Sequence, residues 1–263
     1  MEFDFHGLSV PAAAAIAVYP RLLARHVRNW LRDGLARVLR ALVPLFELLV
    51  PPLGRRLRNW HWIWQPVFGD RWLNGFFADR VDPFRFENNP YEAGKYAHTL
   101  RVIGGRRYGR ALEIGTAEGV FTRLLAPYCE ALTGIDVSEV AVERARQRLA
   151  EFPHVEIRQA MLPVDLPAGP FDLIVASDVL YYLPVDVLRQ MIPRLAQQLA
   201  PGGLPFALHY LGNFGQHTMG RVVHERLHAC PGLELVHEET VEHVGPAGAG
   251  YTLTLLKRPA DRD

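Results

Sequence analysis

A glycine-containing loop near the middle of the chain has the residue types needed to bind a nucleoside. Residues 113–119 read EIGTAEG, in which Gly115 allows a tight turn against a ligand and Gly119 lets the next helix pack closely. The spacing is E-x-G-x-x-x-G and differs from the G-x-G-x-x-G of dinucleotide-binding enzymes. About twenty residues further on, the carboxylate of Asp136 is placed to accept hydrogen bonds from both hydroxyls of a ribose. Together the two features predict an adenosine site.

The loop and Asp136 each follow a short apolar run of the kind that forms a buried strand. Five such runs occur after residue 100, at Ala111–Ile114, Ala131–Ile135, Val155–Ile157, Phe171–Ala176 and Leu204–Leu211. Helical patterns separate these runs, and the alternation predicts an α/β protein with an open, mostly parallel sheet covered on both faces. Ligands bind beyond the carboxyl ends of the strands in such a sheet, which is where both features fall.

Local signals mark where several elements begin and end. Ser138 is placed to cap a helix over Glu139–Ala150. Leucine and isoleucine at helical spacing over Leu188–Leu199 predict another helix, which we expect to end at the Pro-Gly-Gly that follows. Two further strands, Leu233–His243 and Tyr251–Lys257, are joined by a glycine-rich turn and predict a C-terminal antiparallel hairpin. The predicted sheet therefore has seven strands.

The motifs of the chain also resemble those of a known family. LEIGTAEG, GIDVS, FDLIVASDVLYYL and LAPGG occur in the order and spacing of class I S-adenosylmethionine-dependent methyltransferases. The upstream stretch DPFRFENNPYEAGKYAHTL, with RYGRALEIG and the YYL after the fourth strand, is similar to the nodulation protein S type, which methylates the amino group of a sugar. The likeness covers about residues 80–257. It implies a Rossmann-like class I methyltransferase fold, S-adenosyl-L-methionine as cofactor, S-adenosyl-L-homocysteine as product, and no metal.

The resemblance implies which residues surround the cofactor. Glu113, Gly115 and Gly119 would lie around its methionine half, and Asp136 would bind its ribose. Other residues expected to contact it, from the same loops and strand ends, are Thr116, Ala117, Val137, Met161, Leu162 and Ser177. The family usually has an acidic residue after the third strand that binds the adenine amino group, whereas this chain has Ala-Met-Leu at 160–162. Met161 is predicted either to pack on the adenine face or to fill the core.

The residues from Asn89 to Tyr96 are expected to form a helix over the cofactor site. Tyr91, Lys95 and Tyr96 fall within little more than one helical turn. Lys95 would pair with the cofactor carboxylate while a tyrosine closes over the sulfonium. The alternative is that Lys95 is a solvated charge on the helix surface.

Three residues near the same edge of the sheet are candidates for the chemistry, namely Asp178, Tyr181 and His209. Methyl transfer needs the nucleophile and the sulfonium methyl in line at roughly 3 Å. An amine or hydroxyl acceptor must also lose a proton. His209 has the pKa best suited to accept one near neutrality, and Asp178 could orient an ammonium or a sugar hydroxyl. The structural alternatives are a buried, hydrogen-bonded histidine and a helix-capping aspartate.

One motif favours a different chemistry. His224-Glu225-Arg226-Leu227-His228 fits H-E-x-x-H, in which two histidines one helical turn apart bind zinc and the glutamate activates water. The motif lies in a predicted helix between the fifth and sixth strands. The predicted α/β fold already accounts for this helix. A zinc metallohydrolase is therefore kept only as a minor alternative.

Residues 1–66 form a separate compositional unit, with nine arginines against four acidic residues. Arg21, Arg25, Arg28 and Arg32 would share one face of a helix, with apolar residues and Trp30 on the other. Such a basic amphipathic helix either lies on an anionic membrane surface or docks on its own domain. The net charge of the whole chain is only +1, which gives no reason to expect nucleic acid as a partner.

We therefore expect three units: a basic, Trp-rich helical extension over 1–66, a helical cap over the cofactor site at 67–100, and an S-adenosylmethionine-binding methyltransferase domain over 101–263. Two distant cysteines, Cys129 and Cys230, favour a reducing compartment and hence the cytoplasm, with peripheral attachment to the inner face of the membrane as a further expectation. No signal peptide or membrane-spanning helix is predicted. The oligomeric state is left open, with a dimer among the alternatives.

The function predicted from these features is methyl transfer from S-adenosyl-L-methionine to a sugar or glycoconjugate, at an amino group. The substrate would be lipid-linked if residues 1–66 bind a membrane. The nearest alternative is O-methylation of a sugar or another small molecule. A non-catalytic nucleotide-binding module, favoured by the missing acidic residue near Met161, is a third.

Overall fold

The computed structural model describes residues 3–5, 8–10, 31, 34–53, 70–104, 106–212, 216, 218–244 and 248–260. Most of the expected extension over 1–66, including the basic helix around Arg21–Arg32, therefore lies outside the described residues.

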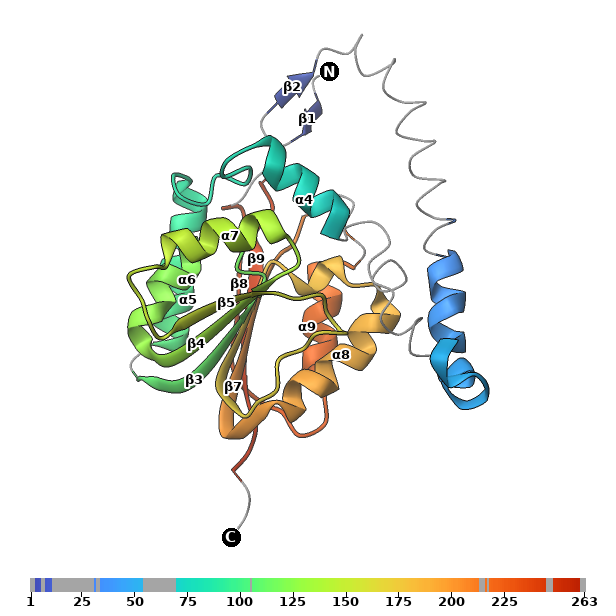
Figure 1. Ribbon diagram of the computed structural model, residues 1–263. Coiled ribbons are helices and arrows are strands. Elements are labelled where there is room, and N and C mark those ends of the chain that lie inside the picture. Colours follow the sequence, from blue (N-terminus) through green and yellow to red (C-terminus); the bar gives the residue numbers. More distant parts are fainter. Residues whose placement is uncertain are drawn as a thin grey trace.

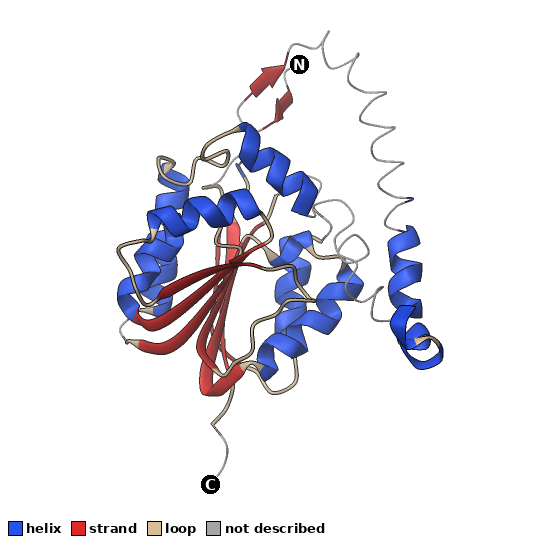
Figure 2. Ribbon diagram, in the orientation of Figure 1, coloured by secondary structure: helices blue, strands red, loops and turns tan. Residues whose placement is uncertain are grey.

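A seven-stranded sheet runs through the centre of the molecule (Figures 1 and 2). Its strands are β3 (Tyr108–Ile114), β4 (Cys129–Asp136), β5 (Val155–Gln159), β6 (Phe171–Ser177), β7 (Leu199–Tyr210), β8 (Glu234–Val241) and β9 (Tyr251–Lys257). They are ordered β5-β4-β3-β6-β7-β9-β8. The pairs from β5 to β7 are parallel, whereas β9 is antiparallel to both of its neighbours. The predicted Rossmann-like fold with a C-terminal antiparallel hairpin is thereby confirmed.

Helices cover both faces of this sheet, as Figure 2 shows. The helices are α4 (Asp70–Asp79), α5 (Pro90–Ile103), α6 (Val120–Leu125), α7 (Glu139–Arg148), α8 (Val185–Gln197) and α9 (Gly220–His228), with short 3-10 turns η1 (Ala126–Tyr128) and η2 (Leu180–Tyr182). In Figure 1, α5, α6 and α7 lie on one side of the sheet and α8 and α9 on the other. Each face of the sheet has its own apolar core, because the central strands are buried on both faces and carry apolar side chains on both.

The order in which successive strands are added to the sheet reverses at β3, which is parallel to both of its neighbours. Ala111 of β3 pairs with Leu132 of β4 on one side and with Leu173 of β6 on the other. The chain adds β5 beyond β4 but β7 beyond β6. The loops after β3, β4 and β6 therefore meet at one point of the carboxyl edge, where open α/β sheets bind ligands.

The predicted helix starts are confirmed by their capping contacts. The Ser138 hydroxyl accepts a hydrogen bond from the backbone N–H of Ala141 (3.2 Å) at the start of α7. The Asn89 side chain accepts one from the N–H of Tyr91 (3.0 Å) at the start of α5. The expected helix over the segment from Asn89 to Tyr96 is thus the first half of α5.

One predicted boundary is wrong. Leu199 is not the last apolar residue of a helix, because α8 ends at Gln197 and Leu199 already pairs with Phe171 as the first residue of β7. The Pro-Gly-Gly sequence lies inside this strand, where the register shifts between Phe171 and Leu173. A β-bulge of this kind absorbs extra residues without ending the strand.

The first part of the chain adds elements outside the sheet. Two short antiparallel strands, β1 (Phe3–Phe5) and β2 (Leu8–Val10), were not predicted by the sequence. Helical backbone follows at residue 31 and over 34–49, a segment at the margin of the molecule in Figure 1. None of the helices described is long and apolar enough to cross a membrane.

Candidate functional site

The loop after β3 takes the shape that its two glycines permit. Gly115 has φ +79°, and a Cβ at this position would lie 2.8 Å from Cγ2 of Val179. Gly119 has the same φ, precedes α6, and lies so close to α7 that a Cβ would come within 3.1 Å of the Ala145 Cβ. Both positions therefore require glycine for conformation and for space, as predicted. Ala117 between them also has a positive φ, +46°.

Asp136 ties this loop to the loop after β4. One carboxylate oxygen accepts the N–H of Ala117 (2.9 Å) and the other accepts the N–H of Ser138 (2.9 Å). Burial raises the pKa of Asp136, while the backbone N–H groups oppose the shift. Since a carboxylate oxygen has two lone pairs, each can still accept a bond from a ligand hydroxyl. Val137 follows directly, and its carbonyl accepts the side-chain amide of Gln159 (3.1 Å).

Lys95 is the centre of a buried charge cluster at the end of β6. Its side chain is 4% exposed, and its ammonium lies 2.9 Å from Oε2 of Glu92 and donates to the carboxylate of Asp178. Burial opposes the charge, but the two carboxylates outweigh it and raise the pKa of Lys95. Burial also raises the pKa of Glu92. Lys95 is therefore not a solvated helix charge, and its pairing with a cofactor carboxylate stays a prediction.

Asp178 is held in an unusual backbone conformation next to Ser177, the last residue of β6. Its φ is +51°, which is uncommon for a residue with a side chain. Its second carboxylate oxygen accepts the N–H of Tyr210 (2.8 Å) at the end of β7. Strained residues of this kind occur where the surrounding contacts over-determine the conformation, often at functional sites.

His209 is wholly buried, with partners at both ring nitrogens. The N–H of Leu180 donates to Nε2 (3.3 Å), and Nδ1 lies 3.3 Å from Nε2 of His224. Because a backbone N–H can only donate, the proton of a neutral His209 is on Nδ1. Burial and the neighbouring His224 keep the pKa of His209 well below its usual value. These contacts favour the structural interpretation, and a role as the base stays a prediction.

The hydrogen-bonded chain continues from His224 to the surface. Nδ1 of His224 lies 2.7 Å from the Thr254 hydroxyl, which donates to Glu238 (2.8 Å), and His228 pairs with the same carboxylate. Burial lowers the pKa of His224 to about 4. The two histidines of the H-E-x-x-H motif thus have different protein partners. Within the ranges described, no three His, Cys, Asp or Glu side chains are grouped to hold a metal.

Aromatic rings line the space around the Lys95 cluster. The Lys95 ammonium lies 5.0 Å from the ring centre of Tyr91. Tyr96 packs on Phe121, with ring centres 5.3 Å apart. Tyr181 is 4% exposed and packs edge to face on His209 at 5.2 Å. The expected closure of a tyrosine over the sulfonium stays a prediction.

The comparisons with known proteins agree with this geometry. The family model described as nodulation protein S matches residues 77–207. Curated nodulation protein S sequences from Sinorhizobium fredii and Rhizobium tropici are 40% and 38% identical over 124 residues, 46% of this chain. The crystal structure of the N-methyltransferase NodS from Bradyrhizobium japonicum WM9, in complex with S-adenosyl-l-homocysteine, is 30% identical with a TM-score of 0.65. That likeness covers 72% of this chain and 98% of the other.

The chain belongs to the nodulation protein S family. Its fold is accordingly that of class I S-adenosylmethionine-dependent methyltransferases. The matched region spans 57% of the Sinorhizobium fredii relative and 52% of the Rhizobium tropici relative. The family model begins at residue 77, so the helix over 34–49 lies outside it.

The polar groups left over at the site fit the cofactor of this family. Among the described residues, four buried side-chain oxygens lack a hydrogen-bond partner, and all four belong to the loop, the elements that flank it or α5: Glu113 Oε2, Thr116 Oγ1, Thr122 Oγ1 and Tyr91 Oη. Leaving such atoms without partners costs free energy, so their presence points to a polar ligand. Burial also raises the pKa of Glu113 to about 7. The ammonium of the methionine half would donate a hydrogen bond to these oxygens and would favour the ionised form of Glu113.

The position of the missing acidic residue is filled by buried apolar side chains. Met161 is 2% exposed and Leu162 5% exposed, and Leu162 belongs to the core next to α8. The carboxylate of Asp165 folds back to accept the N–H of Met161 (3.0 Å). No sequence pattern indicated this contact, because Asp165 lies four positions after Met161. Packing of Met161 on the adenine stays a prediction.

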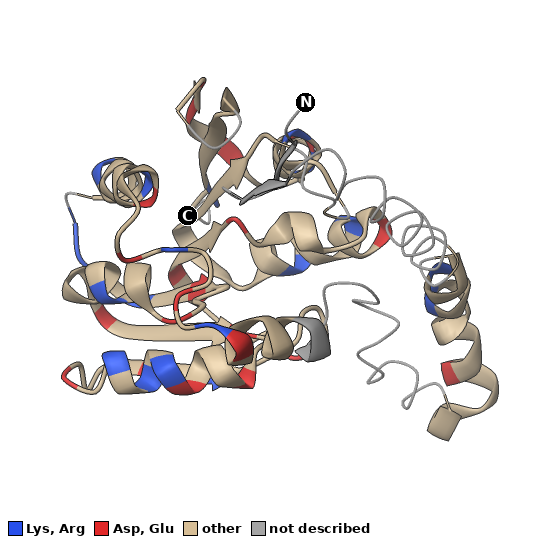
Figure 3. Ribbon diagram, turned by 90° about the horizontal axis from the view of Figure 1, so that it is seen from above, with Lys and Arg blue, Asp and Glu red and all other residues tan. Residues whose placement is uncertain are grey.

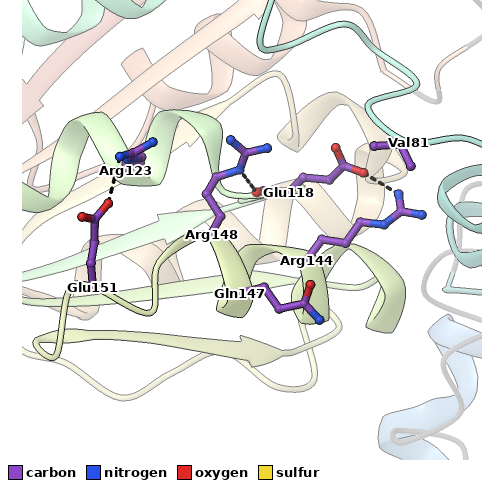
Figure 4. A pocket seen from close by; sticks show the side chains of 7 residues that line it. All are labelled: Val81, Glu118, Arg123, Arg144, Gln147, Arg148 and Glu151. Carbon is purple, nitrogen blue, oxygen red and sulfur yellow. Dashed lines mark hydrogen bonds and ion pairs between the residues drawn. The ribbon is translucent and has the colours of Figure 1, made fainter.

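A separate hollow of about 440 Å³ opens beside α6 and α7 (Figure 4). It is lined by Val81, Glu118, Arg123, Arg144, Gln147, Arg148 and Glu151. Its arginines already have partners: Arg144 pairs with Glu118, Arg148 donates to the Glu118 carbonyl, and Arg123 pairs with Glu151. None of the residues predicted to bind the cofactor or to do chemistry lines it.

Sequence reasoning missed two residues that support the site. Glu92 lies one helical turn before Lys95, and this spacing was the available signal for their contact. Asn74 of α4 accepts a hydrogen bond from the Ser138 hydroxyl (2.8 Å), which links α4 to the start of α7. No local pattern could have shown that contact, because it joins residues 64 positions apart.

Proposed function

We propose that the protein transfers the methyl group of S-adenosyl-L-methionine to an amino group of a sugar or glycoconjugate. Membership of the nodulation protein S family supports this proposal, as does the N-methyltransferase described for its structural relative. The observation that carries it within this chain is the cluster of Lys95, Glu92 and Asp178, placed beyond the loops that Asp136 joins.

The cofactor would supply an electrophilic methyl group on a sulfonium. Glu113 and Thr116 have oxygens that lack partners in the described residues and would accept hydrogen bonds from the methionine half. Asp136 would accept bonds from the ribose hydroxyls while keeping its two backbone contacts. The left-handed turn at Gly115 lets the backbone approach the ligand without a Cβ in the way.

The Lys95 cluster suits an amine acceptor better than a hydroxyl. The carboxylates of Glu92 and Asp178 attract a substrate ammonium, whereas the Lys95 ammonium disfavours a second positive charge beside it. An amine bound there would therefore lose its proton more readily. Glu92, whose pKa is raised by burial, is suited to accept that proton. Deprotonating a sugar hydroxyl would demand a much stronger base than these carboxylates.

The proposal is tested with methyl-labelled S-adenosyl-L-methionine and matched acceptors. Aminosugars and their oligomers would be supplied with the amine either free or acetylated, and the product analysed for N-linked methyl. We expect turnover with free amines only. Asp178→Asn should lower that turnover by on the order of 10²-fold or more. Glu143→Gln, a change at an exposed carboxylate of α7, is the matched control and should leave turnover unchanged.

Two outcomes would overturn the proposal. Methyl transfer to a hydroxyl, at equal rates for free and acetylated amines, would make the protein an O-methyltransferase. Tight binding of S-adenosyl-L-homocysteine without turnover on any acceptor in a broad screen would make it a nucleotide-binding module.

A further inference from the structure

His98 is a buried histidine of α5 that the proposed chemistry does not use. It lies one helical turn after Lys95 and is 5% exposed. Nδ1 of its ring lies 2.8 Å from the hydroxyl of Tyr251, and Nε2 lies 3.1 Å from a carboxylate oxygen of Glu239. These three side chains form a hydrogen-bonded row from the first residue of β9, through α5, to the edge strand β8.

The carboxylate decides the direction of both hydrogen bonds in this row. The side chain of Glu239 is 44% exposed to water, and an ionised carboxylate can only accept. Nε2 of His98 therefore carries the proton and donates to Glu239, whose same oxygen lies 3.6 Å from Nε2 of His237. A neutral imidazole with its proton on Nε2 can only accept at Nδ1. Tyr251, whose pKa is raised by burial, must therefore donate its single hydroxyl proton to His98.

Tyr251 lies beside the Lys95 cluster. Because β9 is antiparallel to β7, its first residue is at the sheet edge where β7 ends, and Tyr251 pairs with Tyr210. The backbone N–H of Tyr210 in turn donates to Asp178 (2.8 Å). The ring centre of Tyr91 is 6.2 Å from that of Tyr251 and 5.0 Å from the Lys95 ammonium. The buried hydroxyl of Tyr91 lacks a hydrogen-bond partner among the described residues, which points to a polar ligand here.

An amine acceptor must present its lone pair, and not an N–H, to the methyl group. A neutral primary amine has two N–H groups and one lone pair, and transfer requires the lone pair in line with the sulfonium methyl. Two acceptor atoms that hold the N–H groups leave the lone pair free, whereas a hydroxyl that donates to the nitrogen occupies it. Acidic and basic residues lie next to one another on several helices (Figure 3), so we expect contacts at the site itself to orient the amine.

We propose that the phenolic oxygen of Tyr251 accepts one N–H of the acceptor amine, and that His98 and Glu239 are positioning residues that keep Tyr251 from donating to that amine. A carboxylate of the Lys95 cluster would accept the other N–H. Since the only proton of Tyr251 is used on His98, its oxygen can only accept from the substrate. The inference rests on the proposed function and adds what orients its acceptor.

The first experiment locates the proton on His98 and needs no turnover. Long-range ¹H–¹⁵N NMR on histidine-labelled protein should show a neutral ring protonated at Nε2, assigned by the loss of its signals in His98→Gln. In Glu239→Gln the ring should shift towards protonation at Nδ1, because an amide N–H can donate to Nε2. The matched control is Glu234→Gln, at an exposed carboxylate of the same strand, which should leave the tautomer unchanged. A parent ring protonated at Nδ1, or at both nitrogens, would overturn the proposal.

The second experiment measures methyl transfer to the amines that the parent methylates. Tyr251→Phe and Glu239→Gln should each lower kcat by about 10-fold with little change in KM, because a misoriented amine binds but does not react. Glu234→Gln should keep the kcat of the parent. A lowered thermal midpoint with unchanged kcat in both variants would make the row a structural contact and overturn the proposal. A parent without turnover on any amine would overturn the proposed function and this inference with it, and the NMR result separates that case from a wrong hydrogen-bond direction.

Discussion

The ammonium of Lys95 in α5 donates to the carboxylate of Asp178 at the end of β6, 83 residues further along the chain. This contact fastens α5, which begins at Pro90, to the strand end where the predicted substrate site lies. Glu92 shares the same ammonium from one helical turn away. These ion pairs thus hold the first half of α5 to the end of β6.

Replacing Lys95 by methionine should destabilise the fold by about 3–5 kcal/mol. The change keeps the length of the side chain but leaves the carboxylates of Glu92 and Asp178 close together without a counter-charge. Urea unfolding measures the effect. The double variant Lys95→Met, Asp178→Asn should be more stable than Lys95→Met alone, because one carboxylate is then neutral. A single variant as stable as the parent would show that the ion pair contributes nothing.

Replacing Glu113 by glutamine should stabilise the ligand-free protein in a pH-dependent way. Burial raises the pKa of Glu113 from 4.5 to about 7, so the folded state holds a proton that the unfolded state has released. Stability of the parent therefore falls between pH 4.5 and 7. Glutamine does not ionise, so the variant avoids this loss. Its free energy of unfolding should exceed that of the parent by an amount that grows from zero to about 3 kcal/mol across that window. Denaturation at several pH values tests this, with Glu143→Gln as the control that should show no such trend.

Replacing Asp136 by alanine should weaken the binding of S-adenosyl-L-homocysteine strongly. Two charge-assisted hydrogen bonds to the ribose would be lost, each worth about 1.5–3 kcal/mol. The variant also loses the contacts to the N–H groups of Ala117 and Ser138, which order the two loops. Calorimetric titration measures the affinity, and NAD should not bind to the parent. A folded variant with unchanged affinity would place the ribose elsewhere.

Alanine substitutions at Gly115 and Gly202 separate backbone strain from steric exclusion. Both glycines have nearly the same φ, +79° and +77°, but a Cβ at Gly202 would meet no atom within 4 Å. Gly202→Ala should therefore cost only the left-handed conformation, about 1–2 kcal/mol. Gly115→Ala should cost more, because its Cβ would collide with Val179, and it should also reduce affinity for S-adenosyl-L-homocysteine. Equal thermal shifts for the two variants would contradict the collision.

The ring nitrogens of His209 and His224 should remain neutral between pH 5 and 8. Burial lowers the pKa of His224 to about 4 and that of His209 well below its usual value. Long-range ¹H–¹⁵N NMR on histidine-labelled protein should show both rings protonated at Nδ1, as the donor at Leu180 requires. Their folded pKa lies below the unfolded one, so stability should fall as pH drops below about 6.5. A His209 that titrates near neutrality would contradict this prediction and would favour its role as the base.

Short-range patterns in the sequence determined the architecture and the shape of the loop after β3. Apolar runs of strand length, the capping residue Ser138, and the glycines at 115 and 119 each act within a few neighbouring residues, so the sequence shows them directly. The spacing from the loop to Asp136 spans a single strand–helix–strand unit, whose length the fold constrains.

Contacts between distant elements were decided only by the tertiary structure. Lys95 was expected either to be solvated or to pair with the cofactor carboxylate. Its partner in the structure is the carboxylate of Asp178, at the end of a strand 83 residues away. His209 was expected to be a base, but its two ring nitrogens contact the backbone N–H of Leu180 and the ring of His224. Leu199 belongs to β7 because it pairs with Phe171 of the neighbouring strand β6. In each case the partner is set by the sheet register and by which helix packs on which face, and no periodicity within one segment encodes that choice.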